Sequence, residues 1–416
     1  MLDNVSNYLN RTRVEELVSN LVKIYSPYFH ENEIMEYVHD WFKERGLPAE
    51  YHHFQEKKVT HFLGTNVFGR LKGEGKGPTI LLNGHLDTVQ ECEGWTKDPL
   101  GAAIEDDRLY GVGALDMKSG CASIMLAVEA FANSFETFDG EILYTFVCDE
   151  EGPYGLGTDA LIVDGIINHA DAAIVAEPSS GFCGIPFPCL CLGARGGWNY
   201  TVNLTGKSAH AAFPEQGTNA IIEACKVISE LKKTEFSADA KLGKGSICII
   251  EMSGGGAAAS VADKASFTVF RHVVRGEDQD YIRSEVDQAV KRANVRGKVA
   301  MKFRDAPHAE NAGFQPYVTS ESNPYTTIMK ESIVSATGKK ETIAYFASMG
   351  DFNYLGSRLK VPTYVFGPYG ENFHAADEYV SLDSVVKTSE VIYDFLKRVL
   401  VEKKASISFL KSDFLS

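Results

Sequence analysis

Strand-like and helical segments alternate over the first half of the chain. Nearly continuous apolar runs, typical of strands buried on both faces, occupy residues 66–72, 78–83, 141–148 and 172–176. Apolar positions recur at helical spacing over residues 13–25, 31–45, 117–132 and 158–167. This alternation predicts an α/β fold, in which a mixed, largely parallel sheet carries helices on both faces.

The pattern changes at about residue 194. Apolar and polar residues alternate over 198–204, 265–273 and 298–304, and helical spacing lies between these runs at 218–233 and 278–293. Alternation indicates strands with one solvent-facing side, so we predict an antiparallel sheet with two helices on one side of it.

The first pattern resumes at about residue 306. It gives a helix near 324–336, a strand at 361–366 and a final helix at 383–401. The simplest account is one domain inserted into another. We therefore predict a discontinuous larger domain, residues 1–193 and 306–416, and an inserted α+β lid domain, residues 194–305.

Composition excludes several classes of partner. The 416 residues carry a formal net charge of −15, which disfavours nucleic acids and anionic membranes as partners. The eight cysteines form no Cys-x-x-Cys pair, and most lie in apolar runs, as reduced structural thiols do. No basic segment followed by an apolar stretch opens the chain, and no run approaches the ~20 apolar residues of a membrane span. We expect a cytoplasmic protein.

Acidic and imidazole side chains follow the strand-like runs of the first domain. His85, Glu150, Glu151 and Glu177 each come directly after such a run. Ligands of largely parallel sheets gather where the carboxyl ends of the strands meet, so these side chains are expected to share one site. Buried carboxylates are costly unless a positive charge compensates them. Together with Asp116 and His374, these four residues predict a site for two metal ions.

The spacing of these residues suggests a chemical role for each of them. In His85-Leu86-Asp87 the imidazole can bind metal while Asp87 accepts a hydrogen bond from the other ring nitrogen. Asp116 follows a glycine-rich segment and could bridge two metals. The alternative, a dinucleotide-binding loop, is disfavoured because position 116 is not glycine. Of the adjacent Glu150 and Glu151, one can bind metal while the other acts as a base.

These motifs make the chain resemble the M20 family of peptidases and deacylases, and most of all its acetylornithine deacetylase and succinyl-diaminopimelate desuccinylase branch. The resemblance covers about residues 10 to 402 and implies a zinc-exopeptidase type of fold. It implies that His85 and Glu177 hold one metal, that Glu151 and His374 hold the other, and that Asp116 bridges them. Glu150 would be the general base and Asp87 would orient His85.

The resemblance also extends to the inserted domain. It implies a homodimer formed through this domain, in which His210 reaches the active site of the partner subunit and stabilises the oxyanion. Arg271 would bind the carboxylate of the substrate, and the peptide bond after Asp116 would be cis. The chain departs from the family pattern at Ser260, where relatives usually carry Asn, at Ala262-Asp263, and in the loosely matching loop Ser348-Met349-Gly350-Asp351.

We expect a metal-dependent amidohydrolase that cleaves a small N-acyl amino acid with a free carboxylate. The metals are expected to be two zinc ions, with cobalt or manganese as substitutes, because the ligands mix imidazole and carboxylate groups. A metal-bound hydroxide would attack the amide with the help of Glu150. Three alternatives remain open: a dipeptidase or carboxypeptidase of the same family, a metal-dependent binding protein without turnover, and a nicotinamide enzyme.

Overall fold

The computed structural model describes residues 5–402, which fall into two units. The first unit runs to Gly193 and resumes at Val318, and the second runs from Ala194 to Tyr317. Residues 306–317, which the sequence assigned to the larger domain, belong to the second unit because the backbones of Gly197 and Phe314 bond each other twice, at 2.8 and 2.9 Å. Met1–Asn4 and the tail from Lys403 lie outside the described residues.

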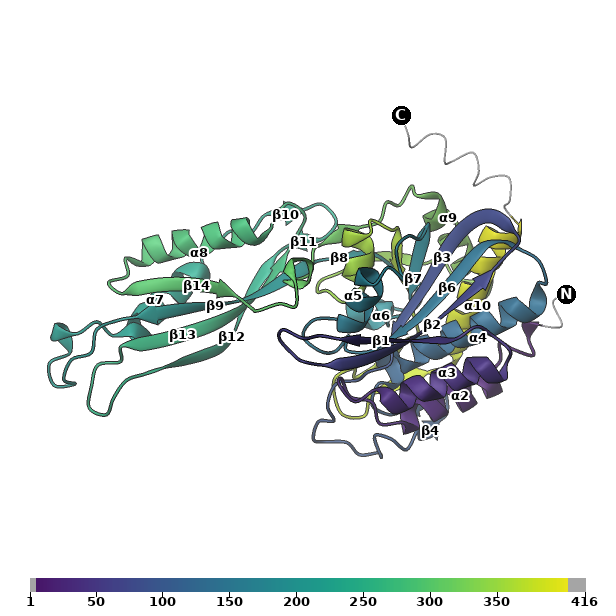
Figure 1. Cartoon of the computed structure of the whole chain (residues 1–416), viewed down its shortest axis with the longest axis horizontal. Helices are drawn as coiled ribbons and strands as arrows, with labels where there is room; N and C mark the ends of the chain where they lie inside the picture. Colours follow the sequence, from purple (N-terminus) through teal and green to yellow (C-terminus); the bar gives the residue numbers. More distant parts are fainter. Residues whose placement is uncertain (1–4, 403–416) are drawn as a thin grey trace. The chain divides into compact units, whose positions relative to one another are not determined.

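A mixed sheet forms the centre of the first unit (Figure 1). Its strand order is β1-β2-β6-β3-β7-β17-β8-β15, and β16 pairs with β8. The pairs β6–β3, β3–β7 and β7–β17 are parallel, whereas β1–β2, β2–β6 and β17–β8 are antiparallel. The strands are β1 Glu50–Gln55, β2 Leu63–Lys72, β3 Gly75–His85, β6 Asp139–Val147, β7 Ala172–Val175, β8 Cys189–Ala194, β15 Tyr317–Val318, β16 Thr342–Phe346 and β17 Thr363–Val365. The predicted mixed α/β sheet is confirmed.

A smaller sheet of the first unit has the strand order β18-β19-β5-β4. Its strands are β4 Ile104–Glu105, β5 Arg108–Tyr110, β18 Gly370–Glu371 and β19 Tyr379–Ser381. Because β19 pairs with β5, the C-terminal segment that carries His374 is joined to the segment that leads into Asp116.

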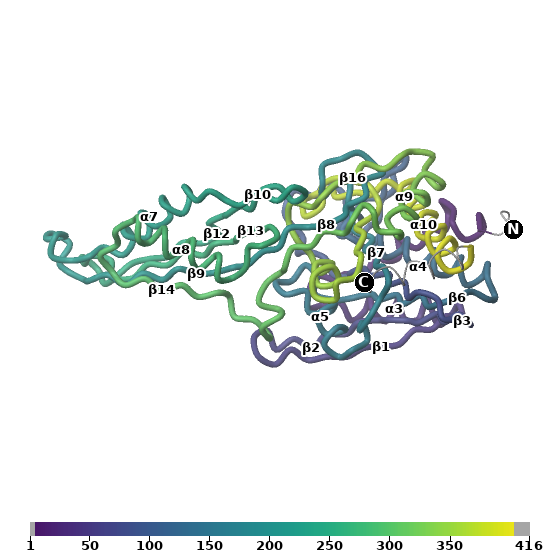
Figure 2. Tube along the Cα trace, turned by 90° about the horizontal axis from the view of Figure 1, so that it is seen from above, coloured from purple at the N-terminus to yellow at the C-terminus, as the bar shows by residue number. Residues whose placement is uncertain are grey.

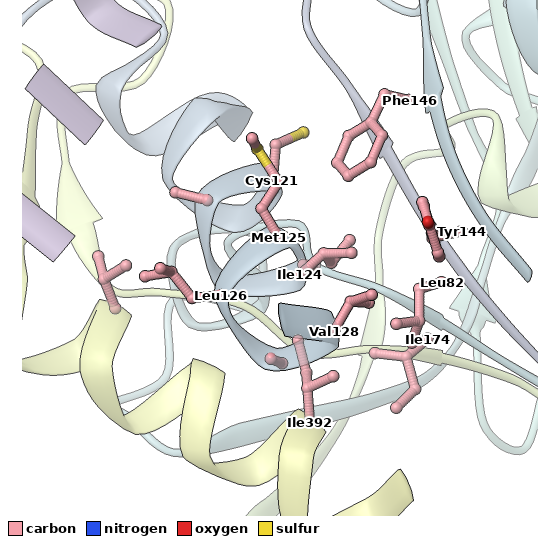
Figure 3. Close-up of a cluster of buried hydrophobic side chains, with 14 of the residues drawn as sticks. Leu82, Cys121, Ile124, Met125, Leu126, Val128, Tyr144, Phe146, Ile174 and Ile392 are labelled. Atoms are coloured by element: carbon pink, nitrogen blue, oxygen red, sulfur yellow. The ribbon is translucent and has the colours of Figure 1, made fainter. Parts of the chain in front are cut away.

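Helices cover both faces of the mixed sheet. One face packs against α2 Arg11–Lys23, α3 Asn32–Glu44, α4 Ser119–Ser134, α9 Pro324–Thr337 and α10 Leu382–Lys397. Figure 3 shows part of this core, where Leu82 and Ile174 of neighbouring strands meet Ile124 of α4. On the opposite face, Asn83 of β3 donates to Thr158 of α5 Leu156–Val163 at 3.3 Å. Strand residues therefore alternate between the two faces, as two-sided burial requires.

The second unit is an antiparallel sheet of order β12-β13-β9-β14 with helices α7 and α8 alongside it (Figure 2). Its elements are β9 Gly196–Thr205, α7 Ala220–Leu231, β10 Ala238–Asp239, β11 Gly243–Lys244, β12 Ser246–Gly255, β13 Lys264–Val273, α8 Gln279–Ala293 and β14 Lys298–Phe303. Asn219 and Asp278 accept hydrogen bonds from the first-turn amides of α7 and α8, which fixes where each helix begins. Alternate residues of β13, such as Phe267 and Val269, are buried, and the predicted lid architecture is confirmed.

Among residues 5–402, no helix combines the length and the apolar character that crossing a membrane would take.

Candidate metal centre

The residues that follow the neighbouring strands β3, β6 and β7 lie at one edge of the mixed sheet. His85 is the last residue of β3 and lies opposite Val147, the last residue of β6. Glu150 and Glu151 come shortly after β6, and Glu177 comes two residues after β7. The parallel register of β3, β6 and β7 therefore brings these side chains together, as the sequence predicted.

Asp116 is presented by a tight turn over Ala114–Lys118. The Asp116–Met117 peptide bond is cis, as the resemblance implied. The buried carboxylate of Glu378 accepts the backbone amides of Gly113, Leu115 and Asp116 at 2.8–3.0 Å. Because Glu378 lies only four residues beyond His374, this contact ties the turn of Asp116 to the loop of His374.

The loop that carries His374 is held in an unusual backbone conformation. His374 itself has φ of 59°, and Asn372 and Asp377 also have positive φ, which few residues other than glycine adopt. The carboxylate of Asp377 accepts the backbone amide and the hydroxyl of Thr96, at 2.9 and 2.8 Å. These contacts tie the loop that carries His374 to the segment of Thr96.

The expected ligands form two groups that share Asp116. His85, Asp116 and Glu177 make one group, and Asp116, Glu151 and His374 make the other; within each, one ligand atom per residue lies within 4.8 Å of the others. His85 Nε2 is 3.3 Å from Asp116 Oδ1 and 3.3 Å from Glu177 Oε1. On the other side, His374 Nε2 is 3.4 Å from Asp116 Oδ2 and 2.8 Å from Glu151 Oε1.

These residues fit a pair of divalent cations. Nitrogen and oxygen ligands ~2.0–2.1 Å from a tetrahedral zinc ion lie ~3.3 Å from each other, which is the spacing around His85 Nε2. Glu177 Oε2 is buried and, within the described part of the chain, has no hydrogen-bond partner. A buried carboxylate oxygen without a donor is costly, and a cation at this position would satisfy it.

The electrostatics of the cluster lead to the same conclusion. Burial raises the pKa of Glu177 to about 8 and raises the pKa of Glu150 well above its usual range. Burial opposes a charge on His374, yet its contacts with Asp116 and Glu151 raise the pKa of this imidazole to about 11. Bound cations would supply a positive charge that lowers the pKa values of the buried carboxyl groups and favours their ionised form.

Glu150 lies beside the two groups and outside both. Its Oε2 is 3.9 Å from His85 Nε2, and its Oε1 accepts the backbone amide of Asp351 at 3.1 Å. The side chain of Asp351 is held in turn by the hydroxyl of Thr158. One carboxylate oxygen of Glu150 is therefore fixed while the other faces the ligand groups, which suits a base that works next to bound cations.

Asp87 orients the site by a different contact from the one expected. His85 Nδ1 donates to the backbone carbonyl of Asp87 at 2.9 Å, whereas the carboxylate Oδ1 is 3.5 Å away. The carboxylate instead accepts the amides of Glu150 and Glu151, at 3.1 and 2.8 Å. Asp87 thus fixes His85 with its backbone and fixes the two glutamates with its side chain, because the β3 and β6 strand ends are adjacent.

Replacing Asp87 with Asn should weaken metal binding by ~10–100-fold, because an amide NH₂ would face one of the two backbone amides that the carboxylate now accepts. Competition with a chromogenic chelator measures the change. Asn in place of the exposed Asp287 is the matched control and should leave affinity unaltered. Equal metal affinity in the Asp87 variant and the control would show that this contact does not support the site.

The two predicted residues of the lid unit have different surroundings. His210 is exposed, and its Nδ1 accepts the amide of Ala212 at 3.1 Å; it also pairs by its backbone with Ser260.

Arg271 is fully buried on the helix-facing side of β13. Its guanidinium bonds both carboxylate oxygens of Glu285 at 3.0 and 2.7 Å and lies 3.2 Å from Glu277. The expectation that Arg271 binds a substrate carboxylate is wrong for this structure, because its donors already pair with these glutamates.

Sequence reasoning missed some residues that support the site. Asp351 was named only as the end of a loosely matching loop. Glu378 was not named, and neither was Lys118, whose buried side chain donates to the carbonyl of Ile24 at 2.8 Å. Their contacts join segments 94 to 265 positions apart, so spacing along the chain carries little sign of them. The one available signal was the adjacency of Glu378 and Lys118 to predicted ligands.

Known proteins similar to this chain include a curated enzyme and several solved structures, each matched over most of the chain. The chain is 26% identical over 327 residues to a succinyl-diaminopimelate desuccinylase of Maricaulis maris, covering 76% of this chain and 80% of that protein. Its fold matches the aminopeptidase PepT of Bacillus cereus with a TM-score of 0.75 at 21% identity, over 94% of this chain and 99% of that one. It also matches the YXEP protein of Bacillus subtilis, described as a dinuclear metal-binding peptidase, with a TM-score of 0.69 at 15% identity, over 92% and 97% of the two chains.

The profile of peptidase family M20/M25/M40 matches residues 81–398, which is more than half of the chain and includes every residue of both ligand groups. The protein is therefore a member of peptidase family M20/M25/M40, a metallohydrolase that acts on C–N bonds.

Proposed function

We propose that this protein hydrolyses the amide bond of a small N-acyl amino acid that carries a free carboxylate. The position of Glu150 is the observation that supports this most strongly. It is a half-buried carboxylate held by the amide of Asp351, next to two ligand groups but in neither of them. A carboxylate in that position suits the activation of water and is not needed for binding metal alone.

Two divalent cations, when bound, supply Lewis-acid polarisation and make water more acidic. The chain's own residues perform the proton transfers. Glu150 takes the proton of the attacking water with the oxygen that Asp351 leaves free, and then delivers it to the leaving nitrogen. Asp87 holds the backbone of Glu150 and Glu151 so that the base and its neighbouring ligand keep their relative positions.

Zinc is the proposed resident metal. The ligand groups mix imidazole nitrogen with carboxylate oxygen, which suits zinc and also accommodates cobalt or manganese. Apoprotein reconstituted with each metal in turn would identify the one that supports the highest turnover.

A dipeptidase or carboxypeptidase activity is the second candidate. The structural neighbour from Bacillus cereus is named an aminopeptidase, whereas the relative from Maricaulis maris is named a desuccinylase. Both reactions require the same metals and the same base. The candidates therefore differ only in the groups that the substrate carries on the nitrogen side and the carbonyl side of the amide bond.

A hydrolysis screen separates the two candidates. N-acetyl, N-succinyl and N-formyl amino acids are compared with unblocked dipeptides, each with added zinc, cobalt or manganese and again after chelation. The proposal expects faster, chelator-sensitive release of the amino acid from an N-acyl substrate. Faster cleavage of dipeptides would favour the second candidate, and no hydrolysis of either class by the metal-loaded protein would overturn both.

We further propose that the lid unit forms a homodimer. Strand β12 is at the end of its sheet order, so one of its edges is open to a further strand, and Ile250 and Met252 on it are 54% and 44% exposed. Ile222 of the neighbouring helix α7 is 55% exposed. A second copy of this unit would cover these apolar side chains, and exposed His210 would act in the partner's active site.

Subunit complementation tests the dimer and His210 together. Variants Glu150→Gln and His210→Ala should each be inactive alone. After subunit exchange, mixed dimers contain one complete site, so activity should return to about a quarter of the wild-type value. Confirmed exchange without recovered activity would contradict a role for His210 across the dimer, and a monomeric wild-type protein in light scattering would contradict the dimer itself.

A further inference from the structure

Three phenylalanine side chains from separate segments of the first unit meet in one cluster, and one of them directly precedes the expected ligand His374. Phe182 of α6 Ser179–Cys183 stacks on Phe346 of β16, with ring centroids 4.6 Å apart and planes inclined by 17°. Phe373 meets Phe182 edge-on, at 5.5 Å and 68°. We call Phe182, Phe346 and Phe373 the aromatic wall.

Each end of the aromatic wall is connected to a residue of the site. Phe373 directly precedes the ligand His374, and their rings are 5.8 Å apart. At the other end, Phe346 lies 6.1 Å from the buried ring of Phe352, which follows Asp351 in the chain. Asp351 is the residue whose amide holds Glu150. The wall therefore runs between the loop of one metal ligand and the loop that fixes the base.

The packing next to Glu150 is also tight. A Cβ atom built on Gly350 would lie 2.5 Å from the ring of Phe352 and 2.8 Å from Glu150 Oε1. A larger residue at position 350 would therefore push on the ring of Phe352 or on the carboxylate of Glu150.

The three rings of the wall are half-buried, unlike Phe352, which is fully buried. A partly exposed cluster of rings beside a reacting centre is typical of a surface that receives an apolar ligand group.

We propose that the aromatic wall selects substrates that carry an apolar, preferably aromatic, group beside the scissile amide. This inference rests on the proposed amide hydrolysis and names the class of substrate for the same site. It predicts a preference that differs from the charged succinyl and diaminopimelyl groups named for the relative from Maricaulis maris.

The arrangement of the rings favours an apolar group over a cation. A cation binds best over an uncovered ring face. In the wall, stacking of Phe182 on Phe346 covers one face of each ring, and the ring of Phe373 also packs edge-on against Phe182. An apolar group gains from contact with any part of the rings, whereas an ammonium or carboxylate placed there would lose hydration.

Four substrates test the inference with the metal-loaded protein. N-acetylphenylalanine is paired with N-acetylornithine, and N-benzoylalanine is paired with N-succinylalanine, so that the apolar group lies on either side of the amide. We expect the apolar member of at least one pair to be preferred by ~10–100-fold in kcat/KM. Phe346→Ala should reduce that preference by ~10-fold or more, while the metal content stays at the wild-type value.

Two further variants keep the result interpretable. Phe135→Ala removes a half-buried phenylalanine that packs on Tyr393, outside the wall, and should leave the preference unchanged. Phe373→Leu keeps an apolar side chain, should fold if Phe346→Ala does not, and should reduce the preference for the aromatic substrate over the charged one.

The outcomes are distinguishable. Failure of the apolar member to be preferred in either pair, or an unchanged ratio in both wall variants, would overturn the inference while leaving amide hydrolysis in place. Absence of turnover with all four substrates and with dipeptides would instead overturn the proposed function on which it rests.

Discussion

Replacing Glu150 with Gln should lower kcat by ~10²–10⁴-fold while the protein still binds two metal ions. The side-chain carbonyl oxygen of the introduced glutamine can still accept the hydrogen bond from the amide of Asp351, so the local structure should persist. The new side chain cannot take a proton from water, however, and proton transfer is the one function that the proposal gives to this position. Steady-state kinetics and metal analysis by mass spectrometry on the same preparation measure the two quantities.

Glu136 provides the matched control for this substitution. It is an exposed glutamate of the same unit, and Glu136→Gln should leave both kcat and metal content unchanged. Glu150→Gln with more than about a tenth of wild-type turnover would remove Glu150 from its role as the base. Loss of metal in the same variant would make it a ligand instead.

Replacing Asp116 with Ala should abolish tight binding of both metal ions, and this is the second large effect that we expect. Asp116 is the one residue shared by the two ligand groups, with Oδ1 near His85 and Oδ2 near His374. Its loss should weaken both sites by more than the ~10–100-fold that outer contacts of a metal site contribute. Activity should fall to the level of the chelated wild-type protein. Isothermal titration of the apoprotein with zinc measures the number of sites and their affinities.

Single-site variants serve as the comparison for Asp116. His85→Ala and Glu151→Ala each remove a ligand that belongs to one group only, so each should retain one tight site. If Asp116→Ala also retains one tight site, Asp116 does not bridge and the two groups are independent.

Much of the fold could be predicted from periodicity because burial imposes it. Strands β3, β6 and β7 are buried on both faces and read as apolar runs, and β9 and β13 alternate because one face of their sheet is exposed. Strand β12 was missed. It is an exposed edge strand, and its register shifts between Ile249 and Glu251, which breaks the alternation that would have revealed it.

The ligands could be predicted for a related reason. His85, Glu150, Glu151 and Glu177 follow strands whose ends must meet, so their grouping is a consequence of a parallel sheet. What the side chain of Asp87 does could not be predicted, because it accepts amides that are 63 and 64 positions away. The expected role of Arg271 came from the family resemblance, and the alternation of its strand gives no sign of the carboxylates that it pairs with. Its partners Glu277 and Glu285 come from the following loop and helix α8.

The most direct test of the account is the anomalous diffraction of a zinc-loaded crystal, measured on both sides of the zinc absorption edge. The account predicts two peaks, one contacted by His85 and Glu177 and the other by Glu151 and His374, with Asp116 touching both and Glu150 touching neither. A single peak, or peaks that leave Asp116 out, would contradict it.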